Sequence, residues 1–367
     1  MIHHDSILAV ASHFDLGGTP VAVKELTAGN INVTYRLDMG EDKTAPRYVL
    51  QRINTVAFKD PVSLMENIGL VTAHIRASYE AEGIDPARRV LNIVPADNGT
   101  LLYTDPEGGA WRAYRFVEDA TAYNAIESAT LFREAGVGFG EFQTRLADFP
   151  AEKLTETIPG FHNTARRFET FLASVEKDAA GRVASVAEEI QFFTSRKALM
   201  SSIVDRLGGE LPLRVTHNDT KLNNVLIDDE TGKALCVIDL DTIMPGSALY
   251  DYGDSIRFGA STAAEDEKDL NKVWCDMELF RTYTEGFLEG CNGSLTDLEV
   301  EMLPMGAKMM TLECGIRFLA DYLNGDTYFR THYEGQNLDR ARTQFKLVAD
   351  MESKWETMHT IVKESVK

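Results

Sequence analysis

The fold of this chain is decided by the stretch Val215-Thr216-His217-Asn218-Asp219-Thr220-Lys221-Leu222-Asn223-Asn224-Val225-Leu226-Ile227, followed by Val237-Ile238-Asp239-Leu240-Asp241. Its two short apolar runs are typical of β-strands. Phosphoryl transfer needs a carboxylate for the attacking hydroxyl and one or two oxygen ligands for Mg²⁺ across the phosphates. Asp219, Asn224 and Asp239 supply this set at a spacing used by kinases. The stretch therefore predicts a phosphotransferase.

Each of these residues also has a structural interpretation. Asn218-Asp219 alone would suit a solvated turn, and Asp239 alone would suit a helix cap. The occurrence of both carboxylates with Asn224, all between apolar strands, favours the catalytic interpretation. His217 is a metal ligand, a general base or, as we favour, a brace for the loop.

Three further carboxylates follow the central stretch: Asp241, Asp251 and Asp254. One of the last two is predicted to accept hydrogen bonds from the catalytic loop. The alternative, that it caps the helix that follows, is left open by the sequence.

Composition limits the class of protein. The chain has 367 residues, 44% hydrophobic and 26% charged, which are globular values and leave room for two domains. Its 57 acidic and 37 basic residues give a net charge of −20, so the surface repels a nucleic acid backbone or an anionic membrane. Neither is an expected partner.

The four cysteines and the N-terminal sequence point to a reducing compartment. The cysteines form no CxxC pair and are expected to be free thiols. The sequence begins without a basic segment ahead of an apolar one, and no uncharged apolar run approaches the roughly 18 residues of a membrane helix. We therefore expect a cytoplasmic protein.

The N-terminal part of the chain is rich in strand patterns. Strands are predicted over 21–26, 32–37 and 47–52, with a tight turn at 27–30. Asp60-Pro61 then predicts a helix start, and strands return near 89–94, 100–103 and 111–117. This order predicts a small mixed lobe that binds nucleotide and covers residues 1–118.

Residues 119–367 are dominated by helical periodicity. Helices are predicted over 131–146, 163–177, 186–207, 263–290, 297–324 and 337–363. Glycines at 136, 138 and 140 indicate close packing against a neighbour, Thr262 and Thr296 begin capping-box patterns, and Pro304 is expected to kink its helix. The fold class is α+β, with a small sheet lobe and a larger helical lobe for catalysis and substrate binding.

The nucleotide side has weaker signals. No Gly-rich phosphate loop occurs, and the turn at Gly29 gives only a minimal phosphate cover. In the third strand Arg52 is expected to contact the phosphates, with Gln51 as the alternative. Phe116 and Glu118 end the small lobe and are expected to bind adenine through their backbone.

These motifs carry a family resemblance. His217-Asn218-Asp219 with Asn224 and Asp239 is similar to the catalytic and metal motifs of the aminoglycoside and choline phosphotransferase superfamily, whose fold is protein-kinase-like. A narrower likeness, to bacterial N-acetylhexosamine 1-kinases, extends from 213–224 and 238–247 to the runs Tyr48-Val49-Leu50-Gln51-Arg52-Ile53-Asn54, Ile256-Arg257-Phe258-Gly259-Ala260-Ser261 and Glu313-Cys314-Gly315-Ile316-Arg317-Phe318-Leu319-Ala320-Asp321-Tyr322-Leu323. Ala28-Gly29-Asn30 departs from the family pattern in having one glycine.

The resemblance implies transfer of phosphate from ATP, with Mg²⁺, to the anomeric hydroxyl of N-acetylglucosamine or N-acetylgalactosamine. It implies that Asp219 is the base and that Asn224 and Asp239 hold Mg²⁺. It also implies that Thr242, Arg317 and Tyr328 lie near the sugar. From the residues alone, Arg317 suits an i,i+4 surface pair with Asp321, and Tyr328 suits a core aromatic.

Other functions compete with this interpretation. A kinase of the same fold acting on an aminoglycoside, choline or another hydroxyl compound would share the motif. A metal-dependent phosphohydrolase would use His217 and the neighbouring aspartates, although such sites usually recruit several histidines. A catalytically silent nucleotide-binding module is the third alternative. The preferred epimer, ATP against GTP, and the oligomeric state are left open by the sequence.

Overall fold

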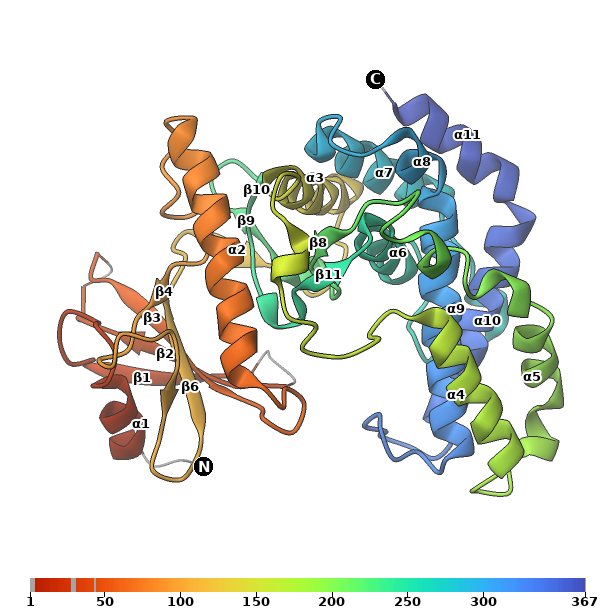
Figure 1. Ribbon diagram of the computed structural model, residues 1–367, viewed down its shortest axis with the longest axis horizontal. Coiled ribbons are helices and arrows are strands. Elements are labelled where there is room, and N and C mark those ends of the chain that lie inside the picture. The colour runs from red at the N-terminus through yellow and green to blue at the C-terminus, as the bar shows by residue number, and fades with distance from the viewer. Residues whose placement is uncertain (1–3, 28–30, 43, 367) are drawn as a thin grey trace. The chain divides into compact units, whose positions relative to one another are not determined.

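A computed structural model describes residues 4–27, 31–42 and 44–366 (Figure 1). The chain divides into two compact units, and each is discontinuous in sequence. The first unit comprises Met1–Thr121, Glu152–Ile158 and Leu226–Met244. The second comprises Ala122–Ala151, Pro159–Val225 and Pro245–Lys367. The division into two lobes between residues 118 and 119 stays a prediction. The description below follows the two compact units instead.

The first unit is built on an antiparallel sheet in the order β1-β2-β3-β6-β4, with β5 also paired to β6. The strands predicted over 21–26, 32–37, 47–52 and 111–117 are confirmed with small shifts at their ends, whereas the predictions over 89–94 and 100–103 are wrong except at residues 93–94 and 103. The predicted turn at 27–30 falls largely outside the described residues. The strands are β1 (Ala22–Leu26), β2 (Val33–Asp38), β3 (Arg47–Ile53), β4 (Ile93–Val94), β5 (Tyr103–Thr104) and β6 (Ala110–Arg115).

One face of this sheet packs against α1 (His4–Ala11), and its alternating side chains form an apolar cluster. Leu37, Leu50 and Ala113 lie at its centre and are fully buried. Register pairs Gln51 with Arg112 and Arg52 with Trp111. Because neighbouring strand residues point to opposite faces, Trp111 and Arg52 lie on the α1 face, and Gln51 and Arg112 lie on the other.

Helix α2 (Pro61–Ala81) begins where Asp60-Pro61 predicted. The Asp60 side chain accepts a hydrogen bond from the Ser63 N–H, and Pro61 occupies the first turn, where its missing N–H costs nothing. The unit also contains most of a small sheet in the order β10-β9-β7. Its strands are β7 (Ala120–Ala122), β9 (Val225–Asp228) and β10 (Ala234–Val237), and the 3₁₀ helices η1 (Ala151–Lys153) and η6 (Leu240–Thr242) accompany the unit.

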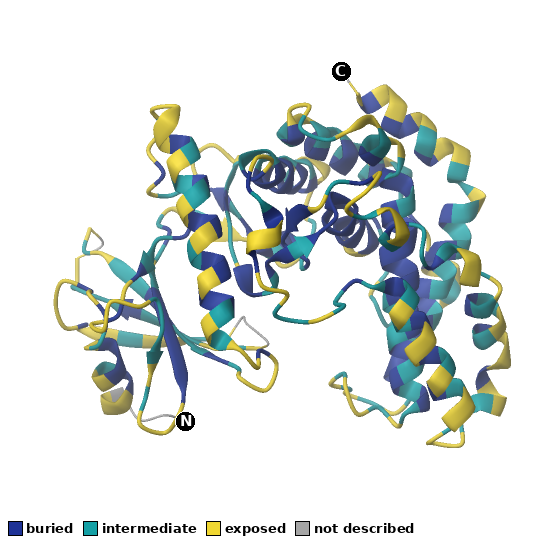
Figure 2. Cartoon of the chain, viewed as in Figure 1, coloured by how far each residue is buried: buried dark blue, intermediate teal, exposed yellow. Residues whose placement is uncertain are grey.

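The second unit is mainly helical, and the α+β fold class is confirmed. At its centre α9 (Leu303–Leu323) is buried on most of its surface, as Figure 2 shows. The short strand β8 (Arg214–Thr216) pairs with β11 (Met244–Gly246). The other helices are α3 (Ala129–Arg145), α4 (Thr164–Lys177), η2 (Val183–Val186), α5 (Ala187–Thr194), η3 (Lys197–Leu199), η4 (Val204–Arg206), η5 (Leu222–Asn224), α6 (Ala248–Gly259), η7 (Leu270–Lys272), α7 (Met277–Cys291), α8 (Asp297–Glu301), α10 (Gln336–Ser353) and α11 (Trp355–Ser365).

Gly136 and Gly140 of α3 pack closely against α7, as predicted, and the same expectation for Gly138 stays a prediction. A Cβ at Gly136 would lie 2.7 Å from the Tyr283 carbonyl oxygen, and one at Gly140 would lie 2.8 Å from the Cys291 nitrogen. Backbone atoms cannot give way at such distances, so these positions require glycine for the two helices to meet.

Several predicted helices have different bounds. The prediction over 186–207 is wrong beyond Thr194, where 3₁₀ turns replace the α-helix, and the prediction over 263–290 is wrong before Met277. The stretch 297–324 is two helices separated at Met302, with Pro304 in the first turn of the second. The last predicted helix is also two, separated at Lys354. Within the described residues, none of the helices has the length and apolar character needed to cross a bilayer.

Candidate active site

The loop between β8 and β9 carries Asp219 and is held in an uncommon backbone conformation. Asn218 has φ of +64°, in the left-handed region that Asn tolerates better than most residues. The preceding Thr216 and His217 are fully buried, and Gly246 of β11 lies so close to Thr216 that an added Cβ would meet its hydroxyl at 2.5 Å. The loop therefore starts from a rigid, buried strand.

Asp251, on α6, fixes this loop through hydrogen bonds. Its carboxylate accepts hydrogen bonds from the His217 N–H at 2.9 Å, the Asn218 N–H at 2.8 Å and the Gln143 amide at 2.9 Å. Burial raises the pKa of Asp251, although the two backbone N–H groups act against this rise. The cap of α6 is Ser247 instead, so the hydrogen-bonding role predicted for one of the two aspartates is confirmed.

His217 braces the loop from inside, as predicted. Its Nδ1 accepts a hydrogen bond from the Asp219 N–H at 3.3 Å. The rings of Phe139 and Phe142 meet the imidazole edge to face, with centroids 5.5 and 6.0 Å away. The two phenylalanine rings and the hydrogen bond from the backbone hold the imidazole in place. These contacts support a structural role for His217.

Asp219 and Asn224 lie together. The Asn224 Nδ2 donates to the Asp219 carbonyl at 2.8 Å and to its Oδ2 at 3.3 Å. Because the amide nitrogen is used within the loop, the amide oxygen is the atom that Asn224 can offer to a cation.

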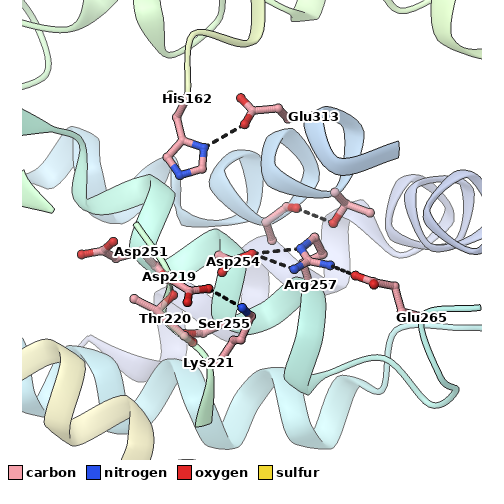
Figure 3. A network of polar contacts seen from close by, with 12 residues as sticks. His162, Asp219, Thr220, Lys221, Asp251, Asp254, Ser255, Arg257, Glu265 and Glu313 are labelled. Carbon is pink, nitrogen blue, oxygen red and sulfur yellow. Dashed lines mark hydrogen bonds and ion pairs between the residues drawn. The ribbon is translucent and has the colours of Figure 1, made fainter. Parts of the chain in front are cut away.

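Lys221 is a site residue that the sequence did not single out. Its ammonium group lies 2.6 Å from Asp219 Oδ1, as Figure 3 shows. Burial acts to lower the pKa of Lys221, but the Asp219 carboxylate outweighs it and the pKa lies above its usual value. The signal available in the sequence was a lysine two residues after the predicted base.

A second layer of bonds ties the loop to α6. The Thr220 hydroxyl donates to the Asp251 carbonyl at 2.5 Å, and the Ser255 hydroxyl donates to the Thr220 carbonyl at 2.7 Å. Asp254 instead pairs with Arg257 of the same helix at 2.9 Å. Burial acts to raise the pKa of Asp254, but Arg257 and other cations lower it below the usual range.

Asp239 and Thr242 belong to the first unit. Asp239 has φ of +60° and immediately precedes η6, which contains Thr242. Two residues on, Asp241 pairs with the guanidinium of Arg112 and accepts a bond from Asn32 Nδ2 at 2.6 Å. Each partner of this ion pair has a side chain only 4% exposed, so the contacts fix the segment that bears Asp239.

Arg112 was not predicted, and it bears on the choice between Gln51 and Arg52. Its Nε and Nη2 donate to Gln51 Oε1 at 2.9 and 2.7 Å, on the face of Asp241. Arg52 instead lies over the Trp111 ring, 5.9 Å from its centroid. The phosphate contact predicted for Arg52 stays a prediction, and Gln51 with Arg112 forms the competing polar group.

Phe116 and Glu118 lie on an extended segment with partly used backbone groups. The Phe116 N–H donates to the Arg47 carbonyl at 2.9 Å, and Arg88 Nη2 donates to the Glu118 carbonyl at 2.9 Å. The Glu118 carboxylate pairs with Arg47. Within the described part of the chain, the Phe116 carbonyl and the Glu118 N–H form no hydrogen bond.

Arg317 is not part of the surface pair with Asp321 that the spacing suggested. Asp321 accepts the N–H groups of Thr327, Tyr328 and Phe329 instead, and so orders the loop after α9. Arg317 lies over the rings of Phe161 and Phe329, 5.8 and 5.4 Å from their centroids. Tyr328 is 71% exposed, which excludes its interpretation as a core aromatic.

The sequence matches a known protein family. Residues 22–283 match the phosphotransferase enzyme family that includes the aminoglycoside phosphotransferases. The chain belongs to this family. The match spans both the strands of the first unit and the loop that carries Asp219 and Asn224.

Solved structures show the same protein-kinase-like fold. A microcompartment-associated aminopropanol kinase superposes with a TM-score of 0.63 at 18% identity, covering 97% of this chain and 99% of that one. An aminoglycoside phosphotransferase from Alicyclobacillus acidocaldarius gives 0.58 at 13% identity, covering 98% and 95%. A spectinomycin phosphotransferase in complex with ADP and spectinomycin gives 0.55 at 13% identity, covering 99% and 98%. At these identities the likeness shows the fold alone.

Proposed function

We propose that this phosphotransferase uses ATP and Mg²⁺ to phosphorylate the anomeric hydroxyl of an N-acetylhexosamine, giving the sugar 1-phosphate. Family membership supplies the reaction class. The observation that carries the catalytic assignment is Asp219 held beside Asn224 in a loop braced by Asp251. The choice of sugar rests on the sequence resemblance over 213–224, 238–247 and 313–323.

Asp219 is the proposed base. Its carboxylate accepts a hydrogen bond from the sugar hydroxyl and takes the proton late, because the transition state of phosphoryl transfer is loose. Lys221 already pairs with this carboxylate. A cation there holds the Asp219 carboxylate in place, and it provides positive charge for the transferred group.

The proposed magnesium ligands suit the ion. Mg²⁺ prefers oxygen ligands and usually takes only one or two carboxylates, with phosphate and water completing its shell. The described residues contain no group of three or more His, Cys, Asp or Glu side chains able to hold a metal without help. We propose Asn224 Oδ1 and the Asp239 carboxylate as the two protein ligands of such an ion. When bound, the ion neutralises charge on the phosphates.

For the nucleotide, we propose that the Phe116 carbonyl and the Glu118 N–H pair with the adenine edge. Adenine presents an amino donor beside a ring-nitrogen acceptor. Among described residues these two backbone groups are unused, and they lie on one extended segment. Arg52 is retained as the proposed phosphate contact, and the exchange Arg52→Ala against Gln51→Ala decides between the two faces.

The acceptor is proposed to lie near Thr242, Arg317 and Tyr328. The Arg317 guanidinium makes no hydrogen bond or ion pair with another described residue, so its donors are available to sugar oxygens. A cation in this place disfavours the alternative substrates, aminoglycosides and choline, which are themselves cationic.

The base assignment is tested by Asp219→Asn. The amide keeps the shape and the neighbouring bonds but cannot accept the proton, so kcat should fall about 10²- to 10⁴-fold. Nucleotide binding, measured by calorimetry, should be preserved. Turnover near the wild-type rate would remove Asp219 from the chemistry.

The acceptor assignment is tested with a panel of free sugars and amino alcohols. N-acetylglucosamine or N-acetylgalactosamine should be consumed with ATP, while the methyl glycoside, whose anomeric oxygen is blocked, should be inert. Phosphorylation of the methyl glycoside at a comparable rate would place transfer at another hydroxyl. Turnover of choline or an aminoglycoside alone would replace the sugar by the alternative substrate class.

A further inference from the structure

His162 lies just before α4 and is part of a buried hydrogen-bonded chain that the catalytic assignments do not use. Its imidazole is 8% exposed, and Nδ1 lies 2.8 Å from Glu313 Oε1. The other oxygen of Glu313 accepts the Thr164 hydroxyl at 2.7 Å. Burial acts to raise the pKa of Glu313, but His162, Arg317 and Thr164 outweigh it and the pKa lies below the usual range. The carboxyl group is therefore ionised.

An ionised carboxylate at Nδ1 fixes the tautomer of the neutral ring. Glu313 Oε1 can only accept, so Nδ1 carries the proton and Nε2 keeps a lone pair. Nε2 is buried and finds no partner among the described residues. A buried polar atom without a partner costs free energy and calls for an explanation, and a ligand is one that suits a site.

Two aromatic rings pack around His162, and a cation lies over one of them. The Phe161 and Tyr250 rings lie 4.5 and 5.1 Å from the imidazole, and Arg317 covers Phe161 from its own helix. Figure 3 shows the second ring nitrogen turned away from Glu313.

We propose that His162 is a specificity-determining residue whose Nε2 accepts a hydrogen bond from a hydroxyl or amide N–H of the acceptor sugar. Glu313 is then a positioning residue that holds the ring proton on Nδ1 and orients Nε2. This inference rests on the proposed sugar kinase function and adds a residue to its acceptor site. Arg317 offers only donors and His162 offers an acceptor, so together they read both kinds of polar group on one neutral molecule.

Two variants separate the contact from its support. His162→Asn places an amide nitrogen where Nδ1 stands, so the bond to Glu313 survives and the Nε2 position is lost. Its KM for the acceptor should rise about tenfold, the effect of one lost hydrogen bond in a closed site, with KM for ATP unchanged. Glu313→Gln keeps its oxygen for Thr164 and turns its NH₂ to Nδ1. The ring proton then moves to Nε2, and KM for the acceptor should rise similarly.

A set of sugars, each lacking one hydroxyl or the acetamido group, identifies the partner. With the wild type one analogue should lose about tenfold in KM, and with His162→Asn that same analogue should lose nothing further. A further reading needs no variant, because the ¹⁵N shift of His162 Nε2 should move when the acceptor is added and should not move with ATP alone.

Three results would overturn the inference: an acceptor KM within twofold of wild type in His162→Asn, equal rises in both KM values, or a silent Nε2 resonance. Failure of the proposed function looks different. In that case the wild type leaves N-acetylhexosamines untouched and phosphorylates another alcohol, and the same KM comparison and ¹⁵N titration are made with that alcohol.

Discussion

Replacing Asp251 by alanine should damage both stability and catalysis, because one carboxylate satisfies three buried donors. The His217 N–H, the Asn218 N–H and the Gln143 amide would lose their acceptor together. Each unsatisfied buried donor costs about 1–3 kcal/mol, and partial relaxation among neighbours keeps the total near the lower end, at about 3–5 kcal/mol. Asp219 follows these donors in the chain, so we also expect kcat to fall about 10- to 100-fold.

The variant Asp251→Asn should lose fewer of these hydrogen bonds. It retains one oxygen and turns an NH₂ group toward the remaining donors, so the loss should be smaller, about 1–3 kcal/mol. Urea unfolding followed by tryptophan fluorescence measures the free energy of unfolding, and steady-state rates at saturating substrate measure kcat.

Tyr252→Phe is the matched control on the same helix. Its hydroxyl bonds to the Thr284 hydroxyl of α7 at 2.7 Å, and Thr284 also donates to the Phe280 carbonyl. This variant should lose about 0.5–1.5 kcal/mol with kcat unchanged. If Asp251→Ala unfolds within 1 kcal/mol of the wild type, or keeps its full kcat, the bracing role is refuted.

Three other outcomes are expected. Gly140→Ala should destabilise the protein by about 1–3 kcal/mol in urea, because the new Cβ would meet the α7 backbone; unchanged stability would mean that α3 and α7 separate easily. Hydrogen bonds from Thr231, aided by Arg88, lower the pKa of Asp228 from 3.8 to about 2. The stability from this ionised group is therefore present above pH 4 and lost as pH falls toward 2, and Asp228→Asn should flatten that part of an acid titration of stability. Burial raises the pKa of all four thiols, to about 12 for three of them. The native protein should therefore react slowly with a thiol reagent at pH 8, whereas the unfolded protein should react fully. Rapid labelling of the native protein would contradict this expectation. These thiols are Cys236, Cys275, Cys291 and Cys314.

Features set by neighbouring residues were predictable from the sequence. Asp60-Pro61 begins α2, and the capping box of Thr296 and Glu299 begins α8, because both signals act within one helical turn. The loop from His217 to Asn224 has the same local character.

The second capping-box pattern failed because its residues have distant partners. The Thr262 hydroxyl donates to the Lys272 carbonyl at 2.7 Å and accepts the Trp274 N–H at 3.0 Å. Glu265 pairs with Arg257 at 3.0 Å. Both side chains are therefore used in tertiary contacts, and no helix begins at Thr262. The next α-helix, α7, begins after Asp276, which caps it.

The Arg112 to Asp241 pair could not be found from sequence spacing, because 129 residues separate its members. The residues that flank an arginine in a strand do not indicate which distant carboxylate it will pair with. The same holds for Asn32, 209 residues from the carboxylate that it contacts. Polar contacts of this range need the fold first.

The discontinuity of the first unit has a consequence for synthesis. Residues 1–121 leave the ribosome early, yet Leu226–Met244, which completes the unit, follows only after Ala122–Ala151 and Pro159–Val225 of the other unit have been made. At about 5–20 residues per second the delay is on the order of ten seconds. During that time the Arg112 cation has no Asp241 carboxylate and cannot be buried without a large cost. The first unit therefore stays incomplete until residue 241 emerges, and we expect a fragment that ends near residue 121 to bind chaperones.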